Sequence, residues 1–190
     1  MLAGGKSRRM GTDKALLEFG GTPLIEVALE RFSGFDEVFI SAPDTGAYAF
    51  TGARAIPDES PGMGPLGGII SVLKAAGQEL VCFRPVDAPL VPAGLHIFLA
   101  EACACRDAAV PAFSGAPEPL LSCFSKKALP ALEGLAARGA LKVADAFPLL
   151  DAAWVDLGSP ELVKRFGDPA RYLVNANDPE TFSKLVFRKA

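Results

Sequence analysis

The chain opens with Leu2-Ala3-Gly4-Gly5-Lys6-Ser7-Arg8-Arg9-Met10-Gly11-Thr12-Asp13-Lys14. The first two residues have the character of the end of an apolar strand. The paired glycines that follow allow the backbone to approach a ligand closely and to point successive N–H groups at it. Four lysine and arginine side chains also lie within nine positions of this stretch. It therefore indicates a phosphate-binding loop that leads out of a strand, with an ordinary basic surface loop as the alternative.

The triplet Gly5-Lys6-Ser7 resembles part of the P-loop of nucleoside triphosphatases, but the rest of that motif is absent. A P-loop needs a glycine five positions before Gly5 and a helix directly after the serine. The chain has no residue at the first of these places, and residues 8–13 carry no apolar stripe. The sequence therefore excludes a P-loop and favours another kind of phosphate-binding loop.

Composition limits the classes of protein to which the chain can belong. It has 190 residues, of which 50% are hydrophobic and 22% charged, and we expect one domain over residues 1–190. The formal net charge of −3 gives no overall attraction to nucleic acid or to an anionic membrane, so neither is expected as a partner. The apolar runs are far shorter than the roughly 18 residues that span a bilayer.

Cysteine and histidine usage excludes several kinds of site. Cys82, Cys103, Cys105 and Cys123 form no CxxC pair, and His96 is the only histidine. A zinc site or a disulfide framework needs closer and more regular spacing, and serine–histidine catalysis has only this one histidine to use. His96 is interpreted as a packing or surface residue, and the protein as reduced and cytoplasmic.

Apolar, β-rich segments alternate with helical patterns, which predicts a three-layer α/β fold with a mostly parallel sheet flanked by helices. The expected strands are Glu37–Ser41, Arg54–Pro57, Leu80–Pro85, Ala108–Phe113, Leu120–Phe124, Ala153–Leu157 and Tyr172–Asn175. The expected helices are Pro23–Phe32, Leu66–Ala76, Gly94–Cys105, Lys126–Ala137, Leu141–Ala146 and Pro179–Phe187. A further strand would end at Leu2-Ala3. Either it is very short, or the true reading frame starts further upstream.

Two aspartates directly follow expected strands. Asp58 comes after Ala55-Ile56-Pro57, and Asp87 comes after the apolar segment 80–86. Ligands of open α/β sheets lie at the carboxyl ends of strands, and Mg²⁺ prefers carboxylate and phosphate oxygens. A metal there would bridge phosphate oxygens and orient the α-phosphorus for attack. The alternative for both residues is a turn aspartate that caps the next helix.

A second loop rich in glycine and proline, residues 58–68, leads from Asp58 into the next expected helix. Its backbone groups can surround the edge of a base while the helix N-terminus faces the ligand. The alternative is a plain strand-to-helix connection. The number of glycines favours binding.

Five segments in this order resemble the molybdenum cofactor guanylyltransferase (MobA-like) family, within the larger group of sugar-nucleotide-type nucleotidyltransferases. They are Leu2–Gly5 with Ser7-Arg8-Arg9-Met10-Gly11, then Asp13-Lys14-Ala15-Leu16-Leu17, Gly64–Gly68, Pro85-Val86-Asp87-Ala88-Pro89 and Asn175-Ala176-Asn177-Asp178-Pro179. The resemblance covers nearly the whole chain and implies a Rossmann-like nucleotidyltransferase fold. It also implies a reaction in which GTP and Mg²⁺ bind, the terminal phosphate of molybdopterin attacks the α-phosphorus, and pyrophosphate leaves.

The resemblance assigns roles to individual positions. It implies catalytic roles for Arg8, Lys14 and Asp87, with Asp87 as the Mg²⁺ ligand. It implies nucleotide contacts at Leu2, Ala3, Gly4, Gly5, Lys14, Ser41, Asp58, Gly64, Pro65, Leu66 and Asp87, and pterin-side contacts at Asn175 and Asn177. No strong general base is needed, because the attacking phosphate is already an anion and positioning with charge neutralisation can carry catalysis.

Two details bear on the base that is recognised. Ser41 stands where the family usually has asparagine, and a hydroxyl replaces only part of the hydrogen bonding of an amide. The Leu2–Gly5 segment, together with Gly64-Pro65-Leu66, resembles the guanylyl branch more than the related cytidylyl branch, which tends to have Leu-Ala-Ala-Gly.

Other functions remain open from the sequence alone. The chain could be a cytidylyl enzyme for the same pterin, a nucleotidyltransferase for a sugar phosphate, or a non-catalytic nucleotide-binding protein that delivers the cofactor. Simple binding does not require both Lys14 and Asp87, which favours an enzyme. Acceptor molybdoenzymes or their chaperones are further expected partners, because a fragile cofactor benefits from direct transfer.

Overall fold

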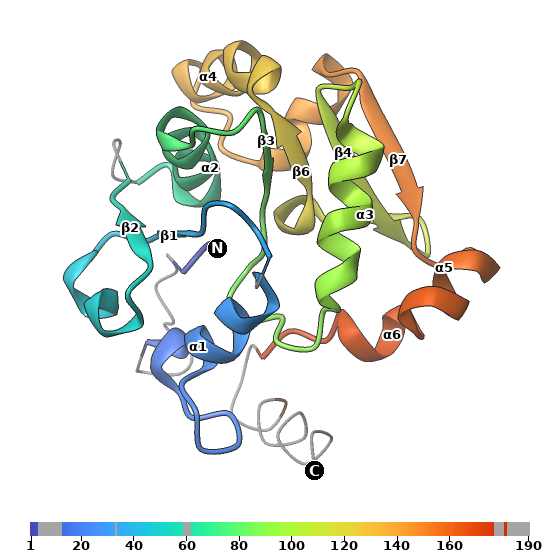
Figure 1. The fold of residues 1–190 in the computed structure, drawn as a ribbon. Coiled ribbons are helices and arrows are strands. Elements are labelled where there is room, and N and C mark those ends of the chain that lie inside the picture. Colours follow the sequence, from blue (N-terminus) through green and yellow to red (C-terminus); the bar gives the residue numbers. More distant parts are fainter. Residues whose placement is uncertain (4–12, 33, 59–61, 177–180, 182–190) are drawn as a thin grey trace.

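The structure is a computed structural model that describes residues 1–3, 13–32, 34–58, 62–176 and 181. Figure 1 shows strands flanked by helices, which confirms the predicted α/β class. The strands are β1 (Phe39–Ser41), β2 (Arg54–Ile56), β3 (Leu80–Cys82), β4 (Ala108–Phe113), β5 (Ala116–Pro117), β6 (Cys123–Ser125) and β7 (Ala152–Asp156). The α-helices are α1 (Leu24–Leu29), α2 (Gly64–Ala75), α3 (Ala93–Cys103), α4 (Leu129–Ala137), α5 (Pro160–Phe166) and α6 (Pro169–Tyr172). The 3-10 helices are η1 (Lys14–Leu16), η2 (Glu30–Phe32), η3 (Gly46–Thr51), η4 (Pro119–Leu121), η5 (Lys126–Ala128) and η6 (Val143–Leu149).

The sheet is mixed rather than uniformly parallel. β1 pairs parallel with β2, and β4 pairs parallel with β7. β6 lies antiparallel between β3 and β4, so β3 and β4 run in the same direction, and β5 pairs antiparallel with the end of β4. Leu2 joins the two parts through parallel bridges to Ser41 and Pro85. The carboxyl ends of β1, β2 and β3 therefore meet at one edge of the sheet.

Met1 lies near the middle of the fold, beside β1 (Figure 1). Its ammonium donates a hydrogen bond of 2.7 Å to the carbonyl of Phe39. Burial, with a smaller contribution from the charge of Arg84, lowers the pKa of this amine to about 5. A cavity of about 330 Å³ lies next to it, lined in part by residues 36–39 and 78–82.

The core follows from the alternation of side chains along the strands. In β4, Ala108 and Val110 face the cluster that contains α2 and α4, whereas Ala109 faces α3. In β6, Phe124 faces the first cluster and Cys123 the second. A third cluster packs α1 and η3 against Ile40 of β1. Apolar layers thus cover both faces of the sheet, which leaves the strand ends for polar chemistry.

One expected strand is wrong. Residues 172–175 do not form a strand, because Tyr172 ends helix α6 and residues 173–176 continue without regular structure. Asp168 caps α6 by accepting a hydrogen bond of 2.9 Å from the amide of Ala170, and Pro169 stands in the first turn. The Asp-Pro pair is a helix-start signal that outweighs the short apolar run after it.

Other boundaries also differ from expectation. Helix α5 was not predicted, although Ser159, Pro160 and the left-handed Gly167 (φ 89°) mark its start and end. The helix expected at 141–146 is the 3-10 helix η6, and the strand expected at 120–124 begins with η4 and continues as β6. The helix expected at 179–187 lies outside the described residues.

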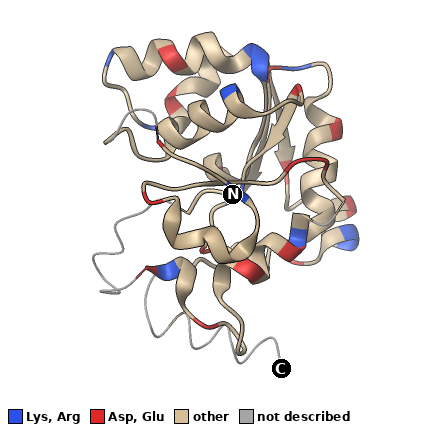
Figure 2. Ribbon diagram, turned by 60° about the vertical axis from the view of Figure 1, so that its left-hand side comes forward, with Lys and Arg blue, Asp and Glu red and all other residues tan. Residues whose placement is uncertain are grey.

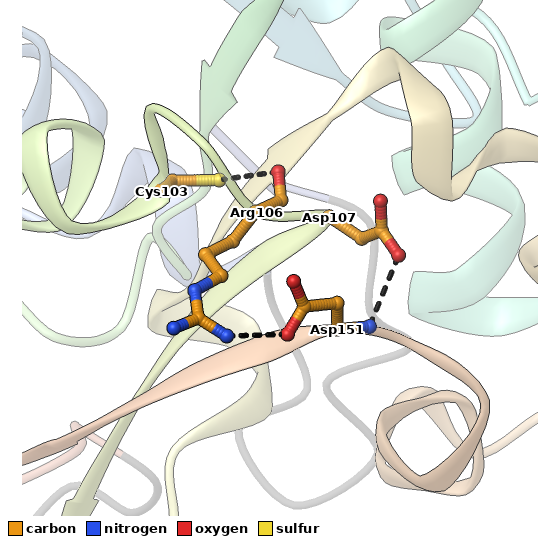
Figure 3. Close-up of polar contacts among 4 residues, drawn as sticks. All are labelled: Cys103, Arg106, Asp107 and Asp151. Carbon is orange, nitrogen blue, oxygen red and sulfur yellow. Dashed lines mark hydrogen bonds and ion pairs between the residues drawn. The ribbon is translucent and has the colours of Figure 1, made fainter.

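A set of polar contacts ties β4 to β7 at their amino ends (Figure 3). Arg106 Nη1 lies 2.5 Å from Asp151 Oδ1, and the Asp107 carboxylate accepts a hydrogen bond of 3.0 Å from the Asp151 amide. Because β3 and β4 run in the same direction, these contacts lie at the opposite edge of the sheet from the carboxyl end of β3. They offer a comparison for the ion pair between Lys14 and Asp87, which lies at that other edge.

Charged side chains of the described residues are distributed over many elements. In the view of Figure 2, Lys and Arg positions alternate with Asp and Glu instead of gathering in one basic patch. No described helix combines the length and apolar character needed to cross a bilayer.

Candidate functional site

The carboxyl ends of β1 and β3 are held together by the first residues of the chain. The Ala3 amide donates to the carbonyl of Ser41 at 2.9 Å, and the Leu2 amide donates to the carbonyl of Arg84 at 2.8 Å. The Val86 amide donates in turn to the carbonyl of Leu2 at 3.1 Å. Both amides and the carbonyl of Leu2 are therefore engaged within the sheet, so neither residue has an uncommitted N–H group for the predicted nucleotide contact.

Lys14 and Asp87 meet at this edge. Lys14 Nζ lies 3.5 Å from Asp87 Oδ2, with 19% and 23% of the two side chains exposed. Lys14 starts η1, whose cap is Asp13: its Oδ1 accepts a hydrogen bond of 3.0 Å from the Ala15 amide. The structure thus brings the expected phosphate-binding lysine and the expected metal ligand together.

Arg84, which the sequence did not single out, holds the turn that carries Asp87 through hydrogen bonds to its main chain. Its guanidinium is fully buried and donates to the carbonyls of Ala88 (2.5 Å) and Val91 (3.1 Å). Burial, followed by the nearby charge of Arg31, lowers the pKa of Arg84 to about 9. An arginine within an otherwise apolar strand segment was the signal for such a role.

The segment after α6 also reaches this turn. The Ala176 amide donates a hydrogen bond of 2.8 Å to the carbonyl of Asp87. Asn175 therefore lies beside the Asp87 turn, although the strand that we expected to carry it is absent. The neighbouring Asn177 lies outside the described residues.

A second group forms where β1, β2 and α2 meet. Ser41 Oγ donates to Asp58 Oδ1 at 3.4 Å. Burial raises the pKa of the Asp58 carboxyl, and the hydrogen bond from Ser41 opposes that shift. Gly68 on α2 packs so closely that a Cβ there would lie 2.3 Å from Ser41 Oγ. A glycine is required at this point because no side chain fits between α2 and β1.

Helix α2 starts at the glycine-rich loop as predicted. Gly64 adopts a left-handed conformation with φ 58°, and Pro65 occupies the first turn. Leu66 is fully buried in the core, so only its main chain is available to a ligand. The N–H groups in the first turn of this 12-residue helix have no partner within the helix and are suited to an anionic or hydrogen-bond-accepting ligand. Gly4, Gly5 and Arg8 lie outside the described residues.

The sequence is similar to those of known proteins over nearly its whole length. The family model described as the MobA-like NTP transferase domain matches residues 1–151. The chain belongs to this family. As a MobA-like NTP transferase, it is 34% identical to the probable molybdenum cofactor guanylyltransferase of Carboxydothermus hydrogenoformans, over 98% of this chain and 93% of the relative. It is 32% identical to the molybdenum cofactor guanylyltransferase of Vibrio atlanticus, over 97% of this chain and 93% of the relative.

A solved structure supports the fold of this MobA-like chain over its whole length. The molybdopterin-guanine dinucleotide biosynthesis protein A of Archaeoglobus fulgidus superimposes with a TM-score of 0.84 at 26% identity, covering 99% of this chain and 96% of that one. The predicted Rossmann-like nucleotidyltransferase fold is confirmed by this match.

The side chains of this site can be compared with the ligands that Mg²⁺ requires. Among the described residues, no three His, Cys, Asp or Glu side chains are arranged to hold a metal ion by themselves. Mg²⁺ in phosphate-transfer sites is bound through one or two carboxylates, with water and substrate phosphates completing the shell. Asp87, whose side chain is 23% exposed, fits that requirement as a single protein ligand.

Proposed function

We propose that the chain transfers GMP from GTP to the terminal phosphate of molybdopterin, with release of pyrophosphate and formation of the guanine dinucleotide cofactor. The observation that carries this proposal is the juxtaposition of Lys14 and Asp87 at 3.5 Å, at the edge where β1 and β3 end. Full-length similarity to proteins named molybdenum cofactor guanylyltransferase supports the choice of nucleotide and acceptor.

Lys14 and Asp87 have different roles toward the triphosphate, the first as a phosphate contact and the second as a metal ligand. A nucleotide entering this edge offers phosphate oxygens to the Lys14 ammonium, which neutralises charge that develops as pyrophosphate departs. Asp87 would hold Mg²⁺, and the bound ion would supply charge neutralisation and alignment of the α-phosphate. Each side chain compensates the other in the absence of substrate. Arg8 adds a phosphate contact from the basic loop.

The nucleoside is assigned to the other group of residues. This group consists of Ser41 at the end of β1, Asp58 after β2, and the start of α2 at Gly64-Pro65-Leu66. Asp58 and Ser41 supply side-chain oxygens there, and the helix start supplies N–H groups. Asn175 and Asn177 are proposed for the pterin side from the family resemblance, and the hydrogen bond from the Ala176 amide to the Asp87 carbonyl holds the neighbouring Asn175 beside the Asp87 turn.

No side chain has to remove a proton from the attacking group. A terminal phosphate is already an anion near neutral pH, so the site needs only to position it and to screen its charge. We further propose that the reaction takes place in the cytoplasm, which the four free cysteine thiols support. Molybdoenzymes or their chaperones would receive the product.

A nucleotide panel tests the assignment. Thermal unfolding is measured with GTP, CTP and UTP, each with and without Mg²⁺. A ligand at 100 times its dissociation constant adds about 2.7 kcal/mol, which corresponds to a rise in Tm of about 5–10 °C for a chain of this size. GTP with Mg²⁺ is expected to give that rise. Stabilisation by CTP or UTP but not by GTP would overturn the guanylyl assignment, and no response to any nucleotide would overturn the nucleotidyltransferase assignment.

A further inference from the structure

Tyr48 connects both ends of the glycine-rich segment that opens the chain. It lies on η3, after β1, and only 3% of its surface is exposed. Its hydroxyl donates a hydrogen bond of 2.6 Å to Asp13 Oδ2, and the carbonyl oxygen of Ala3 lies 3.5 Å from the same hydroxyl. Ala3 and Asp13 are the last and first described residues on the two sides of residues 4–12.

Asp13 passes this contact on to the site. One carboxylate oxygen receives the hydrogen bond from Tyr48, and the other caps η1 through the Ala15 amide at 3.0 Å. Lys14 lies between Asp13 and Ala15 in the sequence, and its side chain extends to Asp87. A shift of the Asp13 carboxylate would therefore turn the first residue of η1, and with it the lysine.

We propose that Tyr48 is a positioning residue for nucleotide binding, which holds the Asp13 carboxylate in place and so presents Lys14 to the phosphates. The proposal rests on the proposed function for its substrate. Tyr48 touches no reacting atom and acts through Asp13. Its ring fills part of the core beside α1, and its hydroxyl is the atom that reaches the Asp13 carboxylate.

The hydroxyl is suited to serve as a permanent donor. Burial raises the pKa of Tyr48 well above its ordinary value, and the hydrogen bond to Asp13 and the charges of Asp13 and Asp44 add to that shift. The phenol therefore keeps its proton throughout the physiological range. A hydrogen bond between this neutral donor and a carboxylate is stronger than one between two neutral groups.

Tyr48→Phe removes the hydroxyl and keeps the packed ring. Fewer constraints on Asp13 leave more ordering to be completed when GTP binds, so the KM for GTP and the dissociation constant for GTP are expected to rise about tenfold. The kcat and the KM for the molybdopterin acceptor are expected to stay at their wild-type values. A wild-type KM and dissociation constant for GTP in this variant would overturn the proposal.

Thr51→Val provides the matched control. Thr51 Oγ1 donates a hydrogen bond of 2.8 Å to the Tyr48 carbonyl within the same 3-10 helix and accepts one of 3.3 Å from the Ala53 amide, and neither bond involves Asp13 or Ala3. Its loss perturbs η3 locally and is expected to leave GTP affinity unchanged. An equal tenfold loss in Thr51→Val would show that the helix, and not the hydroxyl, is responsible, and would overturn the proposal.

An Asp13→Ser background tests the route. Serine can still cap the Ala15 amide, but it is too short to keep the bond to Tyr48. Tyr48→Phe is expected to cause no further loss of GTP affinity in that background, and an additional tenfold loss would contradict the route through Asp13. GTP affinity is measured by calorimetry, which does not depend on turnover. A chain that makes no dinucleotide would refute the proposed function, whereas the difference in GTP affinity between the wild type and Tyr48→Phe would still decide the role of Tyr48.

Discussion

Gly68 lies where helix α2 passes against the end of β1, and its replacement by alanine tests the packing of the nucleoside side of the site. A Cβ at this position would lie 2.3 Å from Ser41 Oγ, and 3.4 Å from both Asp58 Oδ1 and Leu2 Cδ2. The nearest atom would therefore have to move, and the two atoms behind it restrict where it can go. Ser41 would be displaced from Asp58, its hydrogen-bond partner.

Two opposing contributions set the expected magnitude. Alanine in place of glycine favours a helix by about 1 kcal/mol, whereas overpacking a tight contact costs about 1–3 kcal/mol. Gly68→Ala should therefore lower the free energy of unfolding by about 1 kcal/mol. Gly134, within α4, is the matched control, because a Cβ there meets nothing within 4 Å. Gly134→Ala should raise the free energy of unfolding by about 1 kcal/mol, so the two variants should differ by about 2 kcal/mol.

Urea denaturation of both variants measures this difference, with equal m-values as the check that only stability has changed. Ser41→Ala removes the obstructing oxygen, so the Ser41→Ala/Gly68→Ala double variant should be more stable than the sum of the single effects predicts. Gly68→Ala should also weaken GTP binding, because Ser41 and the start of α2 are displaced together. A Gly68→Ala protein that gains as much stability as Gly134→Ala would refute this account of the packing.

Two further predictions concern charge. Burial, followed by the charge of Arg84, lowers the pKa of His96 to about 3, so the folded chain holds the ring neutral while the unfolded chain takes up a proton below pH 6.5. Stability should therefore fall as the pH is lowered, by about 1.5 kcal/mol between pH 6.5 and 5 from this residue, and His96→Leu should remove that part of the slope in urea denaturation; an unchanged slope would count against it. Asp87→Asn should abolish turnover and the Mg²⁺-dependent part of GTP stabilisation without unfolding the chain, whereas Asp151→Asn, in the ion pair at the opposite edge of the sheet, should leave both intact in the same assays (Figure 3). Mg²⁺-dependent turnover by Asp87→Asn would contradict the metal assignment.

Local patterns predicted most of the fold because they depend on neighbouring residues. The apolar runs at Ala108–Phe113 and Leu80–Cys82 are visible in the sequence, and both are strands in the structure. The segment after Pro169 was assigned wrongly, since a short apolar run is compatible with either a helix or a strand. The direction of β6 could not be predicted either, because pairing depends on partners distant in the chain.

The site was predictable to the same extent. Asp87 follows an apolar strand and Lys14 ends a basic glycine-rich stretch, so each could be identified by its neighbours, and the structure pairs them. Tyr48 could not be identified in this way, and Arg84 is marked by its position in an apolar segment while its contacts are not. Tyr48 contacts a residue 35 positions earlier, and Arg84 donates to main-chain carbonyls that carry no signature in the sequence.

Transfer of the nucleotide tests the central claim most directly. The purified chain is incubated with GTP labelled at the α-phosphate, Mg²⁺ and molybdopterin, and both the dinucleotide and the pyrophosphate are measured over time. The account predicts label in a pterin guanine dinucleotide, with pyrophosphate released in equal amount and only when acceptor and Mg²⁺ are both present. A folded chain that binds GTP under these conditions but yields neither product would contradict it.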